Sequence, residues 1–118
     1  MNKKRILVVD DDSDVILSMK AILEKNGHEV ETARSENECM EKYAFFNPDI
    51  IFLDMMMEYM DSGFRVCKGI RESDRSVKIY MLSSVGSDNA GTTDVHEVGF
   101  NGSIEKPVSP EYLLQMVD

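Results

Sequence analysis

Five polar side chains stand at the ends of short, mostly apolar segments, and their types suit a metal ion and a phosphoryl group. They are Asp10, Asp11, Asp54, Ser83 and Lys106. Carboxylates gathered at one point repel each other, and a hard divalent cation such as Mg²⁺ relieves that repulsion. A lysine and a hydroxyl placed opposite the carboxylates can hold the oxygens of a phosphoryl group.

The segments that precede these residues predict the strands of a parallel sheet. Residues 6–9 and 50–53 are apolar at every position, which is typical of strands buried on both faces. We expect five strands, at residues 5–9, 28–33, 49–54, 77–82 and 101–104. Ligands of open α/β sheets bind outside the carboxyl ends of the strands, so the five polar side chains should converge at one edge.

Helices are expected between the strands. The first spans residues 14–26, and the second begins after the capping box Ser35-Glu36-Asn37-Glu38 and ends before Pro48. Further helices are expected at 64–73, at 87–98, where Gly and Thr residues should make it short or frayed, and from Ser109-Pro110-Glu111, cut off at Asp118. The alternation predicts a doubly wound, five-stranded parallel sheet in a three-layer α/β/α architecture.

Composition narrows the class of protein. A chain of 118 residues that is 42% hydrophobic predicts one domain over residues 1–118. The net charge of -9 repels the phosphate backbone of nucleic acids, so this domain should not bind DNA directly. The apolar run at 6–9 is far too short for a signal peptide or a membrane span, and Cys39 and Cys67 show no metal or disulfide spacing. We therefore expect a cytoplasmic protein with two buried thiols.

Each polar motif also has an ordinary structural interpretation. Asp10 to Asp12 can cap a helix, Asp54 can be a loop acid, and Ser83 and Lys106-Pro107 can belong to turns. Their joint occurrence at successive strand ends favours a functional site.

The ordered motifs resemble the receiver domain of two-component response regulators. They are I-L-V-V-D-D-D-S-D-V near the start, D-I-I-F-L-D-M-M-M in the middle, then I-Y-M-L-S-S, and E-K-P near the end. The resemblance implies a flavodoxin-like fold with strand order 2-1-3-4-5. It also implies a phosphorelay in which a sensor histidine kinase or phosphotransfer protein donates a phosphoryl group, with an effector domain or a downstream protein as the reader.

The resemblance assigns a role to each matching residue. Asp54 would be the phosphoacceptor, Ser83 the switch hydroxyl, and Lys106 the cation that pairs with the phosphate. The Mg²⁺ ligands would be Asp10, Asp11, Asp54 and the backbone carbonyl of Met56. In this interpretation the domain is a signalling module and not an enzyme beyond its own phosphotransfer.

The chain departs from the family pattern at three places. Glu58 stands where the family usually has proline, and the usual Asp-Gly turn is interrupted as Asp61-Ser62-Gly63. Ser103 stands where many members have an aromatic residue. The resemblance therefore predicts neither the loop after Asp54 nor the rotation of an aromatic ring as the output.

Two other functions remain open from the sequence. Asp10 and Asp12 fit the D-x-D motif of haloacid-dehalogenase-type phosphohydrolases, as nucleophile and acid/base, although Asp14 and the absence of room for a cap domain count against it. The chain can also be a receiver-like interaction module that never takes phosphate. Flavin binding is disfavoured because the acids at the first strand end would repel the FMN phosphate.

Overall fold

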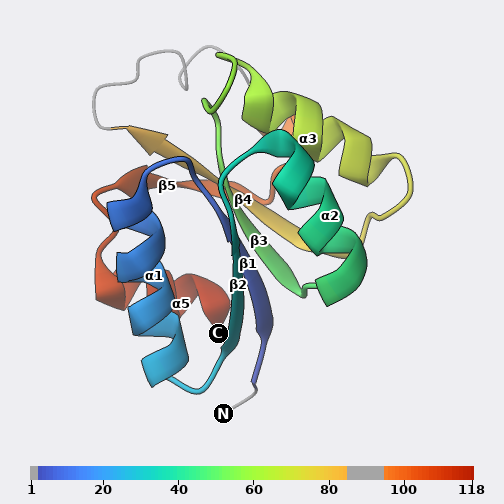
Figure 1. Ribbon diagram of the computed structural model, residues 1–118. Coiled ribbons are helices and arrows are strands. Elements are labelled where there is room, and N and C mark those ends of the chain that lie inside the picture. The colour runs from blue at the N-terminus through green and yellow to red at the C-terminus, as the bar shows by residue number, and fades with distance from the viewer. Residues whose placement is uncertain (1–2, 85–94) are drawn as a thin grey trace.

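The computed structural model describes residues 3–84 and 95–118, and it confirms the predicted five-stranded parallel sheet (Figure 1). The strand order is β2-β1-β3-β4-β5, and every neighbouring pair is parallel. The strands are β1 (Arg5–Val9), β2 (Glu29–Ala33), β3 (Ile50–Asp54), β4 (Lys78–Ser84) and β5 (Gly102–Lys106). The helices in the described ranges are α1 (Ser13–Lys25), α2 (Glu36–Phe46), α3 (Ser62–Arg71), α4 (Val95–Val98) and α5 (Pro110–Val117).

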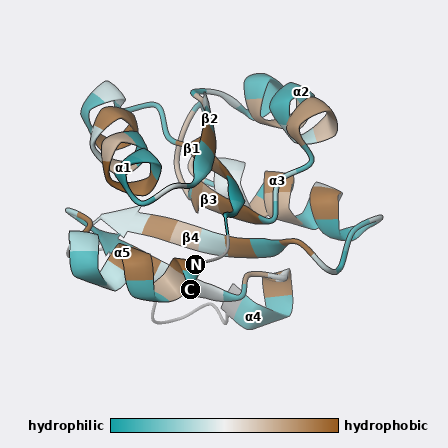
Figure 2. Ribbon diagram, turned by 90° about the horizontal axis from the view of Figure 1, so that it is seen from below, coloured by the Kyte–Doolittle hydropathy of each residue, from teal (hydrophilic) through white to brown (hydrophobic). Residues whose placement is uncertain are grey.

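The sheet is covered on both faces, which explains the continuous apolar runs of its central strands. Seen from below, α1 and α5 lie on one side of the sheet and α2, α3 and α4 on the other (Figure 2). Alternate strand residues pack into the two layers: Ile6, Val8, Phe52, Leu82 and Ile104 toward α1 and α5, and Leu7, Val9, Ile51, Leu53 and Met81 toward α2 and α3. Both faces of β1 and β3 are therefore core.

Side-chain capping explains where three of the helices begin. The side chain of Asp12 accepts a hydrogen bond from the backbone N–H of Asp14 at the start of α1. The Ser35 hydroxyl does the same for Glu38 in α2, and the Ser109 hydroxyl for Tyr112 in α5. These are the caps that the sequence predicts.

Several element boundaries differ from the sequence-based expectation. Strand β5 spans Gly102–Lys106 instead of 101–104, because its last residues pair with Ser83 and Ser84 at the extended end of β4. Helix α3 begins at Ser62, two residues early. Most of the helix expected at 87–98 lies outside the described residues, and the described remainder, Val95–Val98, is helical.

The two cysteines are fully buried and free, as the sequence predicts. Burial raises the pKa of the Cys39 thiol to about 12 and that of Cys67 to about 11. Among the helices of the described residues, none has the length and apolar character that a membrane crossing requires.

Candidate functional site

The register of the sheet brings the predicted acids together at the carboxyl ends of the strands. Val9 pairs with Leu53, so Asp10, which follows β1, and Asp54, which ends β3, lie side by side. Asp54 in turn pairs with Leu82, the residue before Ser83. Lys106 ends β5 opposite Ser84 and extends its side chain back over two strands to the acids.

Asp10 is the most enclosed of these groups, with 0% of its surface exposed. Its Oδ2 accepts a hydrogen bond from the Lys106 ammonium at 2.9 Å, and its Oδ1 accepts one from the backbone N–H of Asp12 at 2.9 Å. Both oxygens therefore have short contacts, which fix the carboxylate and the lysine relative to each other.

Asp54 is held more loosely, although it is only 6% exposed. Its Oδ1 lies 3.5 Å from the Lys106 ammonium and 3.4 Å from the backbone N–H of Met56. Both contacts are at the long limit of hydrogen bonding, so this carboxylate is the better placed of the two to exchange its partners for a ligand.

Burial and charge set the protonation of the site. Burial, and after it the negative charge of Asp10, raise the pKa of Asp54 to about 6, against the opposing charge of Lys106. Burial lowers the pKa of Lys106, but its hydrogen bond to Asp10 and the charge of Asp54 outweigh this, so the net direction is upward. At neutral pH the site holds a lysine cation and an ionised Asp54.

The donor atoms present fit a small, hard cation. Carboxylate oxygens of Asp10, Asp11 and Asp54 all lie within 4.8 Å of one another. Asp11 is exposed, so the cluster opens to solvent at this residue. Oxygen donors from few carboxylates, with room for water and phosphate oxygens, match the coordination that Mg²⁺ prefers.

The remaining predicted residues lie around this cluster. Ser83 is buried near the end of β4, one residue beyond the partner of Asp54. Met56 follows Asp54 by two residues, and its side chain is exposed. The roles predicted for the Ser83 hydroxyl and the Met56 carbonyl stay predictions.

Sequence reasoning missed how closely the start of α3 approaches the acceptor strand. A Cβ on Gly63 would lie 2.6 Å from the carbonyl oxygen of Asp54 and 2.7 Å from the Cα of Met55. The backbone N–H of Gly63 also donates to the carbonyl of Met55 at 2.7 Å. Only glycine fits here, and the signal in the sequence was the glycine that follows Asp61-Ser62.

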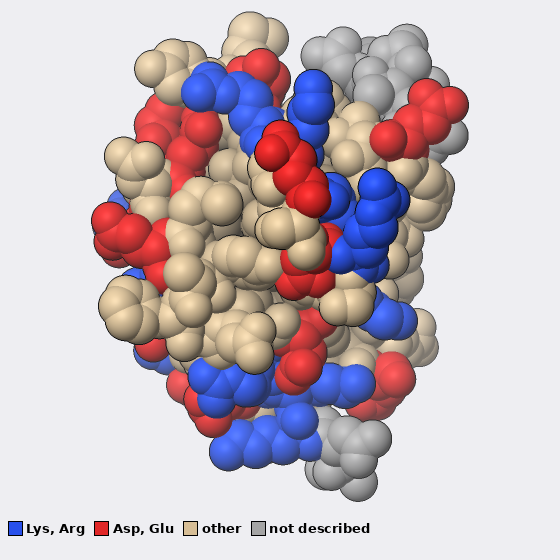
Figure 3. Space-filling model, turned by 90° about the vertical axis from the view of Figure 1, so that its right-hand side faces the viewer, with Lys and Arg blue, Asp and Glu red and all other residues tan. Residues whose placement is uncertain are grey.

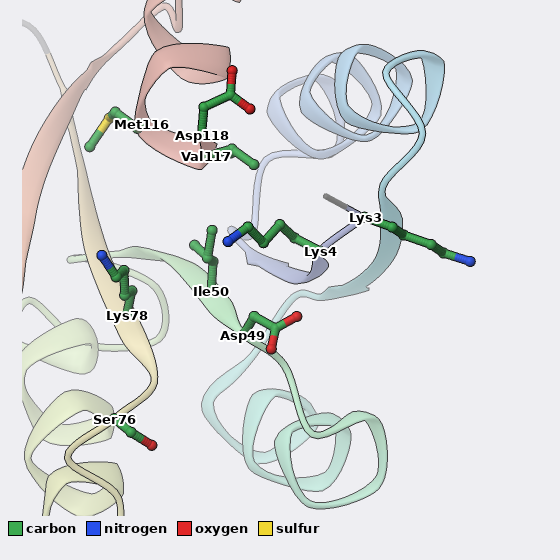
Figure 4. Close-up of a pocket in the computed structure, with 9 residues that line it drawn as sticks. All are labelled: Lys3, Lys4, Asp49, Ile50, Ser76, Lys78, Met116, Val117 and Asp118. Atoms are coloured by element: carbon green, nitrogen blue, oxygen red, sulfur yellow. The ribbon is translucent and has the colours of Figure 1, made fainter. Parts of the chain in front are cut away.

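A surface hollow of about 360 Å³ lies at the other end of the sheet (Figure 4). Lys4 precedes β1, Asp49 precedes β3 and Lys78 begins β4, so this hollow is at the amino ends of the strands. It is therefore separate from the acidic cluster.

Comparison with known proteins identifies the family. The family model "Response regulator receiver domain" matches residues 6–118. The chain belongs to the response regulator receiver domains. Receivers are signalling domains and not classical enzymes.

The similar proteins are either about as long as this receiver or about twice as long, in which case this chain spans about half of their length. It is 34% identical to the chemotaxis protein CheY of Bacillus subtilis over 116 residues, 97% of this chain and 94% of CheY. It is 36% identical to the PhoP transcriptional regulatory protein of alkaline phosphatase synthesis in the same organism, over 93% of this chain and 45% of PhoP. The match to the probable transcriptional regulator ycf27 of Cyanophora paradoxa also spans about half of that protein, 46%.

Solved structures agree with the fold. The chemotaxis response regulator CheY4 of Vibrio cholerae superposes with a TM-score of 0.86 at 30% identity, covering 98% of this chain and 97% of CheY4. This likeness supports the flavodoxin-like assignment made from the motifs.

Proposed function

We propose that this receiver domain accepts a phosphoryl group on Asp54 from a sensor histidine kinase or a phosphotransfer protein, in a reaction that requires Mg²⁺. The observation that supports this most strongly is the arrangement at the end of β3. A buried, loosely held carboxylate lies beside a fixed lysine cation and within 4.8 Å of two further carboxylates.

The contacts favour Asp54 over Asp10 as the nucleophile. Asp10 is fully buried and each of its oxygens accepts a hydrogen bond at 2.9 Å, so whichever oxygen attacked would already be engaged. The side chain of Asp12 is engaged through Oδ1 in capping the start of α1. Both features count against the hydrolase alternative.

The proposed step transfers the phosphoryl group from nitrogen to oxygen. A carboxylate oxygen of Asp54 forms the new bond to phosphorus while the bond to the imidazole nitrogen of the donor phosphohistidine breaks. Negative charge is spread over the three equatorial oxygens, and catalysis consists of positioning and charge neutralisation. Lys106 already stands near Asp54 because Asp10 holds it, so its charge needs little rearrangement.

Asp10, Asp11 and Asp54, with the Met56 carbonyl, are the proposed ligands of the metal ion. When bound, Mg²⁺ would add positive charge next to the phosphoryl oxygens. We assign the Ser83 hydroxyl to the same oxygens after transfer, which would draw the end of β4 toward the acceptor and shift a conformational equilibrium of the domain.

The wider setting is part of the proposal. Residues 1–118 would act as one receiver domain, read by an effector domain or by a separate protein. PhoP and ycf27, described as transcriptional regulators, are about twice as long as this chain, and CheY, a chemotaxis protein, is of similar length. The free Cys39 and Cys67 suit the reducing cytoplasm, where we place the reaction.

Direct nucleic-acid binding is not part of the proposed role. On the face seen in Figure 3, acidic and basic side chains lie next to each other. The net charge of -9 works against phosphate-backbone contacts.

The test is the intact mass of the protein after incubation with acetyl phosphate, with Mg²⁺ or with EDTA. The unmutated protein should gain one phosphoryl group in Mg²⁺ only, and Asp54→Asn should gain none. Asp49→Asn is the matched control, because Asp49 lies at the other end of β3 and its amide oxygen can still accept from Arg5. Turnover that depends on Asp10 would support the hydrolase, and no gain in any variant would support the interaction module.

A further inference from the structure

The loop between β3 and α3 directly follows Asp54, and two contacts fasten it to the start of α2. The Ser62 hydroxyl donates to Oε2 of Glu36 at 2.7 Å. The carboxylate of Glu58 accepts from the backbone N–H of Glu36 at 3.1 and 3.3 Å. Glu58 and Ser62 are the positions at which this chain departs from the family pattern in the loop, so the fastening is a feature of this chain.

Ser62 is fully buried, and both functions of its hydroxyl are used. Besides donating to Glu36, its oxygen accepts the backbone N–H of Tyr59 at 3.0 Å. Tyr59 in turn accepts backbone hydrogen bonds from Met57 and Ser62, both at 3.3 Å. The Ser62 hydroxyl thus closes the loop on itself and provides one of the two contacts of the loop to α2.

The Glu36 carboxylate is also largely enclosed, with 16% of its side chain exposed. Its Oε1 faces the guanidinium of Arg65 at 3.6 Å, and that guanidinium lies 4.9 Å from the ring centroid of Tyr59. Loss of the Ser62 hydroxyl would leave an enclosed carboxylate oxygen and a backbone N–H without these partners, which is unfavourable in a low dielectric.

A short chain of contacts connects Ser62 to the acceptor residue. The next residue, Gly63, donates its backbone N–H to the carbonyl of Met55 at 2.7 Å. A Cβ on Gly63 would come within 2.7 Å of the Asp54 and Met55 backbone. The start of α3 therefore lies directly against the backbone that leads into Met56, and a shift of Ser62 would be transmitted to it.

We propose that Ser62 and Glu36 are positioning residues of the phosphoacceptor site, whose hydrogen bond holds the backbone at Met55 and Met56 where the Met56 carbonyl binds the metal ion. This rests on the proposed function of Asp54. Neither side chain touches the phosphoryl group or the ion. Their effect is on metal affinity, because one of the ligands is placed by the loop they hold.

The experiment is a calorimetric Mg²⁺ titration without any phosphodonor. Ser62→Ala and Glu36→Ala should each weaken Mg²⁺ binding, on the order of tenfold, as the loss of supporting partners around metal sites does. Their double variant should weaken Mg²⁺ binding by less than the two single effects combined, because both variants remove the same Ser62–Glu36 bond. Glu36→Gln keeps an acceptor for Ser62 and should lie closer to the unmutated protein.

Glu41→Ala is the control for charge. Glu41 is exposed on the same helix, and its removal changes the net charge as much as Glu36→Ala does. It should leave Mg²⁺ affinity unchanged. Circular dichroism on each variant confirms that the compared proteins are folded.

A second readout separates affinity from chemistry. In acetyl phosphate, Ser62→Ala should raise the Mg²⁺ concentration for half-maximal phosphorylation by the same factor by which it weakens Mg²⁺ binding in the titration. The rate at saturating Mg²⁺ should stay nearly unchanged. If the role of Ser62 were purely structural, Ser62→Ala would lower stability without changing the Mg²⁺ requirement separately from the saturated rate.

The positioning proposal is overturned if folded Ser62→Ala binds Mg²⁺ as tightly as the unmutated protein, or if Glu41→Ala weakens binding as much as Glu36→Ala. Absence of Mg²⁺ binding by the unmutated protein overturns it as well. If the unmutated protein binds Mg²⁺ but takes no phosphoryl group, the proposed function fails, and the titrations still decide the role of Ser62 and Glu36 in metal binding.

Discussion

Replacing Asp54 with asparagine should stabilise the fold when no metal is present. Burial and the charge of Asp10 raise the pKa of Asp54 from its ordinary 3.8 to about 6, so the ionised carboxylate is disfavoured in the folded state. This pKa difference corresponds to a cost of about 3 kcal/mol for keeping Asp54 ionised in the folded protein. The amide loses the charged contact to Lys106, a long one at 3.5 Å, so we expect a net gain of about 1 to 2 kcal/mol.

The sign of the pH dependence follows from linkage. Between about pH 4 and pH 6 the folded protein binds more protons at Asp54 than the unfolded chain does, so its stability falls as the pH rises through this window. Above this pH window Asp54 is ionised in both states, and its destabilising effect on the fold is complete. The advantage of Asp54→Asn should therefore be largest near neutral pH and shrink toward zero as the pH falls below about 4.

Urea unfolding in EDTA at several pH values measures this advantage. Glu41→Gln is the control, because it removes one exposed negative charge without touching the site. The reasoning is refuted if Asp54→Asn is less stable than the unmutated protein at neutral pH. It is also refuted if the advantage grows on acidification or if Glu41→Gln gives the same gain.

Three further predictions concern other parts of the fold. Lys106→Ala should still permit some phosphorylation but abolish the conformational response, seen as backbone amide shifts around Ser83 with beryllofluoride; shifts as large as in the unmutated protein would reject this role. Gly63→Ala should lower the free energy of unfolding by about 1 to 3 kcal/mol because the new Cβ meets backbone, whereas Gly69→Ala in the same helix has open space and should be neutral or stabilising. The two cysteines are buried with raised pKa values, so thiol reagents should label them only after unfolding, and rapid labelling of the native protein would contradict their burial.

The sheet and most of the site could be predicted from the sequence because their signals are local. The unbroken apolar run at 50–53 indicated a doubly buried strand, and a parallel sheet then placed Asp54 beside Asp10. The Lys106 side chain lies against Asp10 and Asp54, as predicted, although its strand was predicted too short and its role stays a prediction. Nothing local shows that β5 continues, since Glu105 and Lys106 are polar and are ordered by pairing with Ser83 and Ser84.

The loop after Asp54 could not be predicted because its contacts join residues far apart in the sequence. Ser62 and Glu36 are 26 positions apart, and no periodicity or motif links them. Glu58 looked like a substitution for proline and proves to accept a backbone N–H at the start of α2. Such contacts depend on how two helices pack and therefore become visible only in three dimensions.

The central claim is that Asp54, and no other side chain, carries the phosphoryl group. Borohydride reduces an acyl phosphate of aspartate to homoserine, so peptide mass spectrometry after reduction identifies the modified residue directly. The protein treated with acetyl phosphate and Mg²⁺ should show homoserine at position 54, dependent on both reagents. Homoserine at position 10 or 11, or none anywhere in a protein that binds Mg²⁺, would contradict the account.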